Sequence, residues 1–166
     1  MPSFHIRTAT SDDVDSIDAI YTHYVVHTHV TFDLEPRSTA QRREWFSHYS
    51  ASGRHRVLVA VADGDVVGYA TSGRWRPKAA YDTSVETSVY VADGVTGNGI
   101  GTRLYAELFE ALEAEDVHRA YAGIALPNDA SISLHTRFGF TRAGLFSEQG
   151  RKFGRFWDVA WYEKKL

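Results

Sequence analysis

The chain has 166 residues, of which 43% are hydrophobic and 23% charged, and this balance predicts one globular domain spanning residues 1–166. Its formal net charge of −3 argues against nucleic acid as a partner, because proteins that bind nucleic acids usually carry a basic excess. It contains no cysteine, which excludes disulfides, thiolate metal sites and a cysteine nucleophile, and no apolar run of transmembrane length or signal-peptide pattern, so we expect a cytoplasmic protein that binds no membrane.

The first third of the chain predicts a strand and two helices. Residues 4–9 alternate between apolar and polar side chains, as a strand does. Apolar residues then recur at helical spacing over residues 10–28. Residues 30–36 form an extended segment, and a second helix is expected over residues 38–52, closed by Gly53.

The middle of the chain predicts three strands and a helix. Residues 55–62 and 65–75 have strand patterns, and the Asp-Gly turn at 63–64 between them is a strong signal for a hairpin. A further strand is expected over residues 83–92, rich in β-branched side chains. Residues 100–115 have the spacing of an amphipathic helix.

The last part of the chain predicts another strand, a helix and a hairpin. The strand covers residues 117–126, and the helix covers residues 128–138 and ends at Gly139. The remaining tail is rich in strand formers, with a turn expected near residues 150–154. Many strands, interleaved helices and an early hairpin indicate an α/β (α+β) fold with a mixed sheet, not a doubly wound parallel one.

The stretch VTGNGIGTRL, residues 95–104, places three glycines directly before the helix that follows. Such a turn exposes unpaired backbone N–H groups at the positive end of a helix, which favours an anion. A dinucleotide fingerprint beginning at Gly97 needs a glycine where Thr102 stands, and a P-loop needs a lysine where Thr102 follows Gly101. Both motifs fail, which leaves a purely structural turn or another kind of phosphate loop.

Glu86 is the most unusual residue of the strand predicted over residues 83–92, because its neighbours are apolar or β-branched. A carboxylate buried in such a strand is costly unless it has a partner or a chemical task. Two interpretations stay open: a general base, or a buried ion pair with Arg74 or Arg76.

The glycine stretch resembles the pyrophosphate loop of the GNAT superfamily of N-acetyltransferases, whose pattern is Gln or Arg, two residues, Gly, one residue, and Gly or Ala. Gly99 and Gly101 match, whereas Thr96 replaces the Gln or Arg. The segments THVTFDLEP, VETSVYV, LPNDASISLHTRFGF and KFGRFWDV are similar to the phosphinothricin acetyltransferase branch, in the same order along the chain. The resemblance implies a GNAT fold with a mostly antiparallel central sheet of about seven strands. The fourth and fifth strands would be parallel beside the cofactor, with helices on both faces.

In such enzymes the acetyl group of acetyl-CoA passes directly to a primary amine, here of a small amino-acid-like substrate of the phosphinothricin, methionine sulfoximine or methionine sulfone type. The resemblance gives Glu86 the role of general base, His135 a role in protonating or stabilising the leaving thiolate, and Tyr105 a role in polarising or orienting. It also implies a homodimer and no metal. The implied substrate-binding residues are Phe32, Arg74, Arg76 and Lys78. The implied cofactor-binding residues are Val89, Tyr90, Val91, Thr96, Gly97, Asn98, Gly99, Ile100, Gly101, Thr102, Asn128 and Ser131.

Several of these residues have plainer explanations. A lone helical histidine such as His135 and an aromatic such as Tyr105 are often core residues, and Asn128 has the place of a helix N-cap. His23 and His27 are spaced four apart, as zinc ligands on a helix often are, but the glutamate of a metalloprotease helix is missing. Two other functions stay open: a GNAT enzyme acting on a peptide N-terminus or polyamine, and a non-catalytic acetyl-CoA-binding regulatory module.

Overall fold

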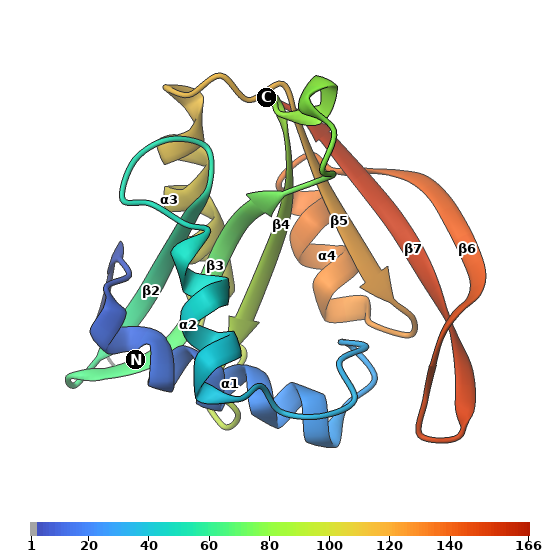
Figure 1. The fold of residues 1–166 in the computed structure, drawn as a ribbon, viewed down its shortest axis with the longest axis horizontal. Coiled ribbons are helices and arrows are strands. Elements are labelled where there is room, and N and C mark those ends of the chain that lie inside the picture. Colours follow the sequence, from blue (N-terminus) through green and yellow to red (C-terminus); the bar gives the residue numbers. More distant parts are fainter. Residues whose placement is uncertain (1–2) are drawn as a thin grey trace.

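The computed structural model of the protein describes residues 3–166, whose strands form one sheet in the order β1-β2-β3-β4-β5-β7-β6 (Figure 1). All neighbouring strands are antiparallel except β4 and β5, which are parallel. The mixed, mostly antiparallel sheet predicted from the sequence is therefore confirmed. The strands are β1 Phe4–Thr8, β2 Arg56–Ala62, β3 Asp65–Arg74, β4 Ser84–Val91, β5 Arg119–Ala125, β6 Thr141–Lys152 and β7 Arg155–Lys165.

Helices cover both faces of this sheet. Helices α3 (Ile100–Glu113) and α4 (Asp129–Arg137) contribute to the larger core, whereas α1 (Val14–His27) and α2 (Thr39–Ser47) pack over the opposite face. Short 3₁₀ turns occupy 11–13 and 79–81. Within residues 3–166, every helix falls short of the length and apolarity that crossing a membrane requires.

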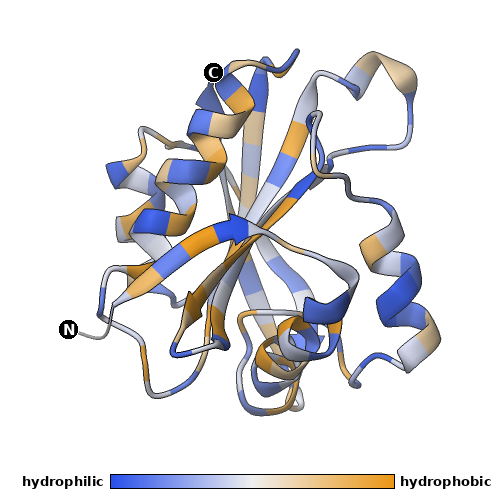
Figure 2. Ribbon diagram, turned by 90° about the vertical axis from the view of Figure 1, so that its left-hand side faces the viewer, coloured by the Kyte–Doolittle hydropathy of each residue, from blue (hydrophilic) through white to orange (hydrophobic). Residues whose placement is uncertain are grey.

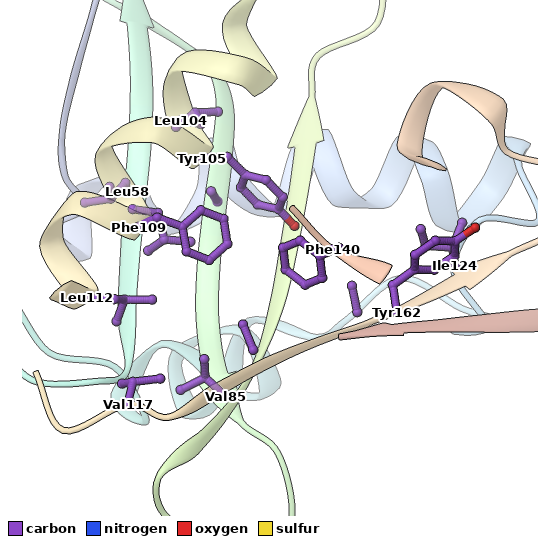
Figure 3. Packing of buried hydrophobic residues seen from close by; sticks show 14 of the residues in the cluster. Leu58, Val85, Leu104, Tyr105, Phe109, Leu112, Val117, Ile124, Phe140 and Tyr162 are labelled. Atoms are coloured by element: carbon purple, nitrogen blue, oxygen red, sulfur yellow. The ribbon is translucent and has the colours of Figure 1, made fainter. Parts of the chain in front are cut away.

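The larger core lies between α3 and the sheet. Leu104, Leu108 and Leu112 are fully buried at helical spacing and belong to one hydrophobic cluster with Val85 of β4. Figure 3 shows Leu104, Leu112 and Val85 among the residues of this cluster. Each such leucine contributes about 1.5–3 kcal/mol through the apolar area it removes from water. Figure 2 shows the corresponding pattern, with apolar stretches along the central strands and alternating apolar and polar bands along the helices.

The β2–β3 hairpin has the predicted two-residue turn, with positive φ at Asp63 (51°) and Gly64 (93°). Its register then shifts, because Val61 pairs with Val66 whereas Ala60 pairs with Gly68. One extra residue of β3 is therefore accommodated as a β-bulge. This shift decides which residues lie opposite each other at the far end of the hairpin.

The helix predicted over residues 38–52 is wrong at its C-terminal end, because α2 stops at Ser47. The Ser47 hydroxyl donates to the carbonyl of Glu44 at 2.7 Å, and the next N–H groups bond three residues back instead of four. Such hydroxyl bonds compete with the helical ladder and favour termination. The chain after Ser47 is thus free to turn toward the edge of β2.

Gly68 of β3 permits the start of α3 to pack closely on the sheet. A Cβ at this position would lie 3.1 Å from Ile100 Cγ2 and 3.3 Å from Leu104 Cδ1. We predict that Gly68→Ala lowers the free energy of unfolding by about 1–3 kcal/mol through overpacking, measured by urea denaturation. Gly144→Ala on β6 is the matched control, because nothing lies within 4 Å of a Cβ there. Equal stability of the two variants would contradict this interpretation.

Candidate active site

A cleft opens in the sheet where β4 and β5 separate. The two strands pair only between residues 84–86 and residues 119–121, and both continue beyond that point without pairing to each other. The separation is visible toward the lower part of Figure 1, where α4 lies beside the two strands. The cleft measures about 480 Å³ and also borders the start of α3.

The open edge of β4 presents backbone groups to this cleft. The N–H of Ala92 donates to Val67 of β3, so by strand alternation the N–H and C=O groups of Val89 and Val91 face the other way. The Tyr24 hydroxyl already donates to the Val91 carbonyl at 2.6 Å. Val91 N–H and both groups of Val89 are therefore the part of this edge available to an extended ligand.

The glycine turn forms the anion-binding end of the cleft. Gly97 and Gly99 have φ values of 84° and 77°, a left-handed conformation that glycine adopts readily. The first helical bond of α3 runs from Arg103 N–H to the Gly99 carbonyl at 3.0 Å. The N–H groups of residues 100–102 precede that bond, so they lack helical partners at the positive end of the helix dipole. This arrangement fits a diphosphate.

The predicted cofactor residues lie at this cleft, with one exception. The side chain of Asn98 donates to the Val95 carbonyl at 3.1 Å and does not border the cleft. The Asn128 side chain caps α4 by accepting from Ser131 N–H at 3.1 Å. Asn128 also borders the cleft, so it combines the place of a helix cap with that of a cofactor-binding residue. The bordering residues are Val89, Tyr90, Val91, Thr96, Gly97, Gly99, Ile100, Gly101, Thr102, Asn128 and Ser131.

Glu86 borders a second, polar hollow on the α1 and α2 side of the sheet. Its carboxylate is half-buried and forms no hydrogen bond or ion pair with any residue of 3–166. Burial raises the pKa of Glu86, and the charge of Arg76 opposes that rise only in part. The ion-pair alternative is not realised, because Arg74 donates to the carbonyls of Arg76 and Pro77 instead.

The cleft and the polar hollow meet at one residue of β4. Ser88 borders both, and Glu86 lies two residues away on the same face of the strand. A group reaching Ser88 from the cleft would therefore meet a molecule held in the hollow beside a carboxylate of raised pKa. This geometry suits a proton transfer coupled to an attack across the strand.

Tyr105 and His135 form a buried pair at the wall of the cleft, which His135 itself borders. The Tyr105 hydroxyl lies 2.9 Å from His135 Nε2, and His135 Nδ1 lies 2.7 Å from the Ser131 carbonyl. Since only a protonated Nδ1 bonds to that carbonyl, Tyr105 is the donor to Nε2. Burial lowers the pKa of His135 and raises that of Tyr105, so both side chains are neutral at pH 7.

The predicted substrate residues do not converge as closely. Of the four, Arg74 alone borders the hollow that contains Glu86, and Arg76 contributes its charge from an exposed position over the Trp75 ring. Lys78 is exposed in the loop before β4. The ring of Phe32 presses on the backbone of Gly150 in β6, so it fixes the loop after α1 against that strand.

Eight of the ten residues that border the hollow were not predicted as site residues, and three of them matter most for its shape: Tyr49, His55 and Ser88. Tyr49 follows α2, His55 precedes β2, and Ser88 lies on β4 itself. Alternation along β4 already put Ser88 on the face of Glu86, so this residue was within reach of sequence reasoning. Tyr49 and His55 depend on where α2 ends and on the bulge in β3, and neither feature has a clear sequence signal.

The comparisons with known proteins agree with this geometry. A sequence model described as an acetyltransferase (GNAT) domain matches residues 6–161. A phosphinothricin N-acetyltransferase of Streptomyces coelicolor is 53% identical, with 97% of this chain and 95% of that protein covered. An L-methionine sulfoximine/L-methionine sulfone acetyltransferase of Pseudomonas aeruginosa is 37% identical, with 99% and 95% covered. The crystal structure of a phosphinothricin acetyltransferase from Sinorhizobium meliloti in complex with acetyl-CoA is 33% identical, with a TM-score of 0.92 over 98% of this chain and 88% of that one.

The glycine turn generates a paired prediction. Gly99→Ala should cost about 1–2 kcal/mol, because an L side chain is strained in the left-handed conformation, and should weaken acetyl-CoA binding measured by calorimetry. Gly101 lies within α3, where an added Cβ would meet Leu134 at an ordinary 3.5 Å. Gly101→Ala should therefore keep the stability and affinity of the wild type. If Gly101→Ala weakened acetyl-CoA binding more than Gly99→Ala did, the backbone conformation at Gly99 would not be what holds the diphosphate.

The Tyr105–His135 pair generates a prediction about stability. Tyr105→Phe leaves the buried Nε2 of His135 without its donor, so we expect a loss of about 1–3 kcal/mol in urea denaturation. Tyr81→Phe serves as control, since Tyr81 is exposed. A Tyr105→Phe variant as stable as this control would show that the hydrogen bond contributes nothing.

Proposed function

Because this chain belongs to the GNAT acetyltransferase family and is an acetyl-CoA-dependent N-acetyltransferase, we propose that it acetylates the primary amine of a small amino acid. The proposed acceptors are of the phosphinothricin, methionine sulfoximine or methionine sulfone type, the substrates that the names of its relatives state. The observation that carries the proposal is the meeting of the cleft and the Glu86 hollow at Ser88.

The residues of the cleft fit acetyl-CoA. The N–H groups of residues 100–102 suit its diphosphate, and the free edge groups of Val89 and Val91 suit the amides of its pantetheine arm, paired as an added strand would be. When bound, acetyl-CoA would supply an activated thioester carbonyl, and Ser88 is the residue that borders both the cleft and the hollow. Everything else that the reaction needs must come from side chains around the hollow.

Glu86 is the proposed general base. The acceptor arrives as an ammonium ion, and Glu86 takes one proton from it, directly or through one water molecule. The freed nitrogen lone pair forms the new C–N bond, and the C–S bond breaks with its electron pair going to sulfur. The nitrogen then loses its second proton and the thiolate takes up one proton, so the products are the N-acetylated amino acid, free CoA thiol and protonated Glu86. The raised pKa of Glu86 brings its basicity closer to that of a base working near neutral pH. The absence of cysteine fits direct transfer without an acyl-cysteine intermediate.

We assign His135 and Tyr105 a narrower role than the sequence resemblance implied. Both nitrogens of the neutral His135 ring are already hydrogen bonded, so the ring has no spare proton for the leaving thiolate. His135 is instead a positioning residue that holds the first turn of α4 through Ser131, whose hydroxyl lies 3.3 Å from Nδ1. Ser131 and His135 both border the cleft, and because the His135 nitrogens are already bonded, the Ser131 hydroxyl is the group that we propose to stabilise the leaving thiolate.

The hollow favours amino acids over the alternative acceptors. It presents the guanidinium groups of Arg54 and Arg74 together with His55, whereas Asp82 and Glu86 are its acidic residues. A polyamine would require a predominantly acidic groove, and this balance disfavours it. A non-catalytic binding module has no need for an unpaired, half-buried carboxylate, which is costly to maintain.

We further propose that the chain functions in the cytoplasm as a homodimer formed through the β6–β7 hairpin. Large apolar side chains are unusually exposed there, which is typical of a surface that another protein covers. These side chains belong to Leu145, Phe146, Phe153 and Phe156.

The decisive experiment measures thiol release from acetyl-CoA with a panel of amines, using the wild type and Glu86→Gln. We expect activity with phosphinothricin and methionine sulfone, and a kcat lower by about 10²–10⁴-fold in the variant. The wild-type rate should fall as the pH drops through the raised pKa of Glu86, because the base works deprotonated, and the variant should lack this dependence. Glu110→Gln, exposed on α3, is the matched control.

The same variant carries a stability readout. A carboxyl group whose pKa is raised in the folded state stabilises the fold below its unfolded pKa, and this contribution is lost as the pH rises through the folded pKa. At neutral pH Glu86→Gln should therefore unfold at the same temperature as the wild type or higher. Full activity in Glu86→Gln would remove Glu86 from its proposed role, and binding of acetyl-CoA without turnover on any amine would support the binding module.

A further inference from the structure

His55 has a buried ring nitrogen with no explanation in the fold. Its Nε2 is inaccessible to solvent and finds no hydrogen-bond partner within residues 3–166. The side chain borders the polar hollow that also contains Glu86. Buried polar atoms are almost always paired in native proteins, so an unpaired one in a side chain that borders a hollow points to a partner that arrives with a ligand when the ring adjusts to it.

The strand register aligns His55 with Glu86 across the sheet. Gly73 pairs with Glu86, and Arg56 pairs with Ser72, so the same register continued by one residue puts His55 opposite Gly73. Opposed residues of antiparallel strands share a face, and two strand spacings separate the outer pair by about 9.5 Å. Gly73 has no side chain, so β3 itself places nothing between His55 and Glu86.

The Tyr49 side chain lies over Gly73. A Cβ at Gly73 would lie 3.1 Å from the Tyr49 hydroxyl, which therefore stands above the glycine between the two ends of the row. The Tyr49 hydroxyl therefore shields the Gly73 backbone and adds a hydrogen-bonding group halfway between His55 and Glu86. The hollow is thus an elongated polar site with Glu86 at one end and His55 at the other.

The two ends of this row differ in charge. Arg54 and Arg74 flank the His55 end, and together with burial they lower the pKa of the imidazole, while Asp82 opposes them. Arg54 donates to the Asp82 carbonyl at 2.8 Å, so its guanidinium is held in place. The Glu86 end carries a carboxylate without a counter-ion. A molecule that satisfies both ends has an amine at one end and an acidic or strongly polar oxygen at the other.

We propose that His55 is a specificity-determining residue that binds the distal oxygen group on the side chain of the acceptor amino acid. This inference rests on the proposed function, since the amine of the same molecule lies at Glu86. The separation of the two ends selects acceptors whose acidic group is several bonds from the amine, and the α-carboxylate is too close to the amine to span it. Amino acids with a phosphinate or sulfone on the side chain meet this requirement.

The test compares His55→Leu with the wild type on two acceptors. For phosphinothricin, kcat/KM should fall at least about tenfold, chiefly through KM, because a hydrogen bond to a charged group is lost. For norleucine, which has no side-chain oxygen, kcat/KM should stay within about twofold, as should the KM for acetyl-CoA. His118→Leu, an exposed histidine outside the hollow, is the matched control and should leave all three values unchanged.

Two further measurements separate specificity from folding and from catalysis. His55→Leu should melt at the same temperature as the wild type or higher, because it removes an unpaired buried nitrogen. Calorimetry should show weaker phosphinothricin binding to the variant even if no amine is acetylated, which would support this inference while overturning the proposed function. Turnover by the wild type with an unchanged preference in His55→Leu would overturn this inference alone. Neither binding nor turnover by the wild type would overturn both.

Discussion

The parallel pairing of β4 with β5 is confined to residues 84–86 and 119–121, and the site depends on its ending there. Beyond that point each strand keeps an unpaired edge, which costs free energy unless water or a ligand satisfies its backbone groups. The neighbouring pairs on either side, β3 with β4 and β5 with β7, remain long and hold the two edges apart. The cleft is therefore a rigid consequence of the sheet topology, and Glu86 lies at the last paired position.

Two opposed demands act on the strand that carries Glu86. One face of β4 contributes Val85 to the larger hydrophobic core, whereas the other holds an unpaired carboxylate beside a polar hollow. The hydrophobic face fixes the strand, so the cost of the desolvated carboxylate is offset by packing a few ångströms away. The buried Tyr105–His135 pair plays a comparable part at α4, because its hydrogen bonds fix the turn that contains Ser131.

The sequence alone predicts most of this frame, because alternation, helical spacing and the Asp-Gly turn are local signals. The glycine turn at Gly99 and the face of β4 on which Glu86 lies were predictable for the same reason. The position of His55 was not, because it depends on the one-residue bulge between the pairs of Ala60 and Val61. Without that bulge, Ser72 would lie opposite His55 in place of Gly73. The end of α2 and the inward turn of the Asn98 side chain likewise depend on hydrogen bonds that periodicity does not reveal.

Ser88 is the residue that borders both the cleft and the polar hollow, and this small overlap has a consequence for how specificity evolves. Segments from β4, β5, α3 and α4 border the cleft proposed for acetyl-CoA, whereas segments around α2, β2 and β3 border most of the hollow proposed for the acceptor. Substitutions in the second group are able to alter which amine is accepted while the donor continues to bind as before. Proteins with this fold are therefore able to change their acceptor through substitutions in the hollow alone, while the residues of the cleft stay the same.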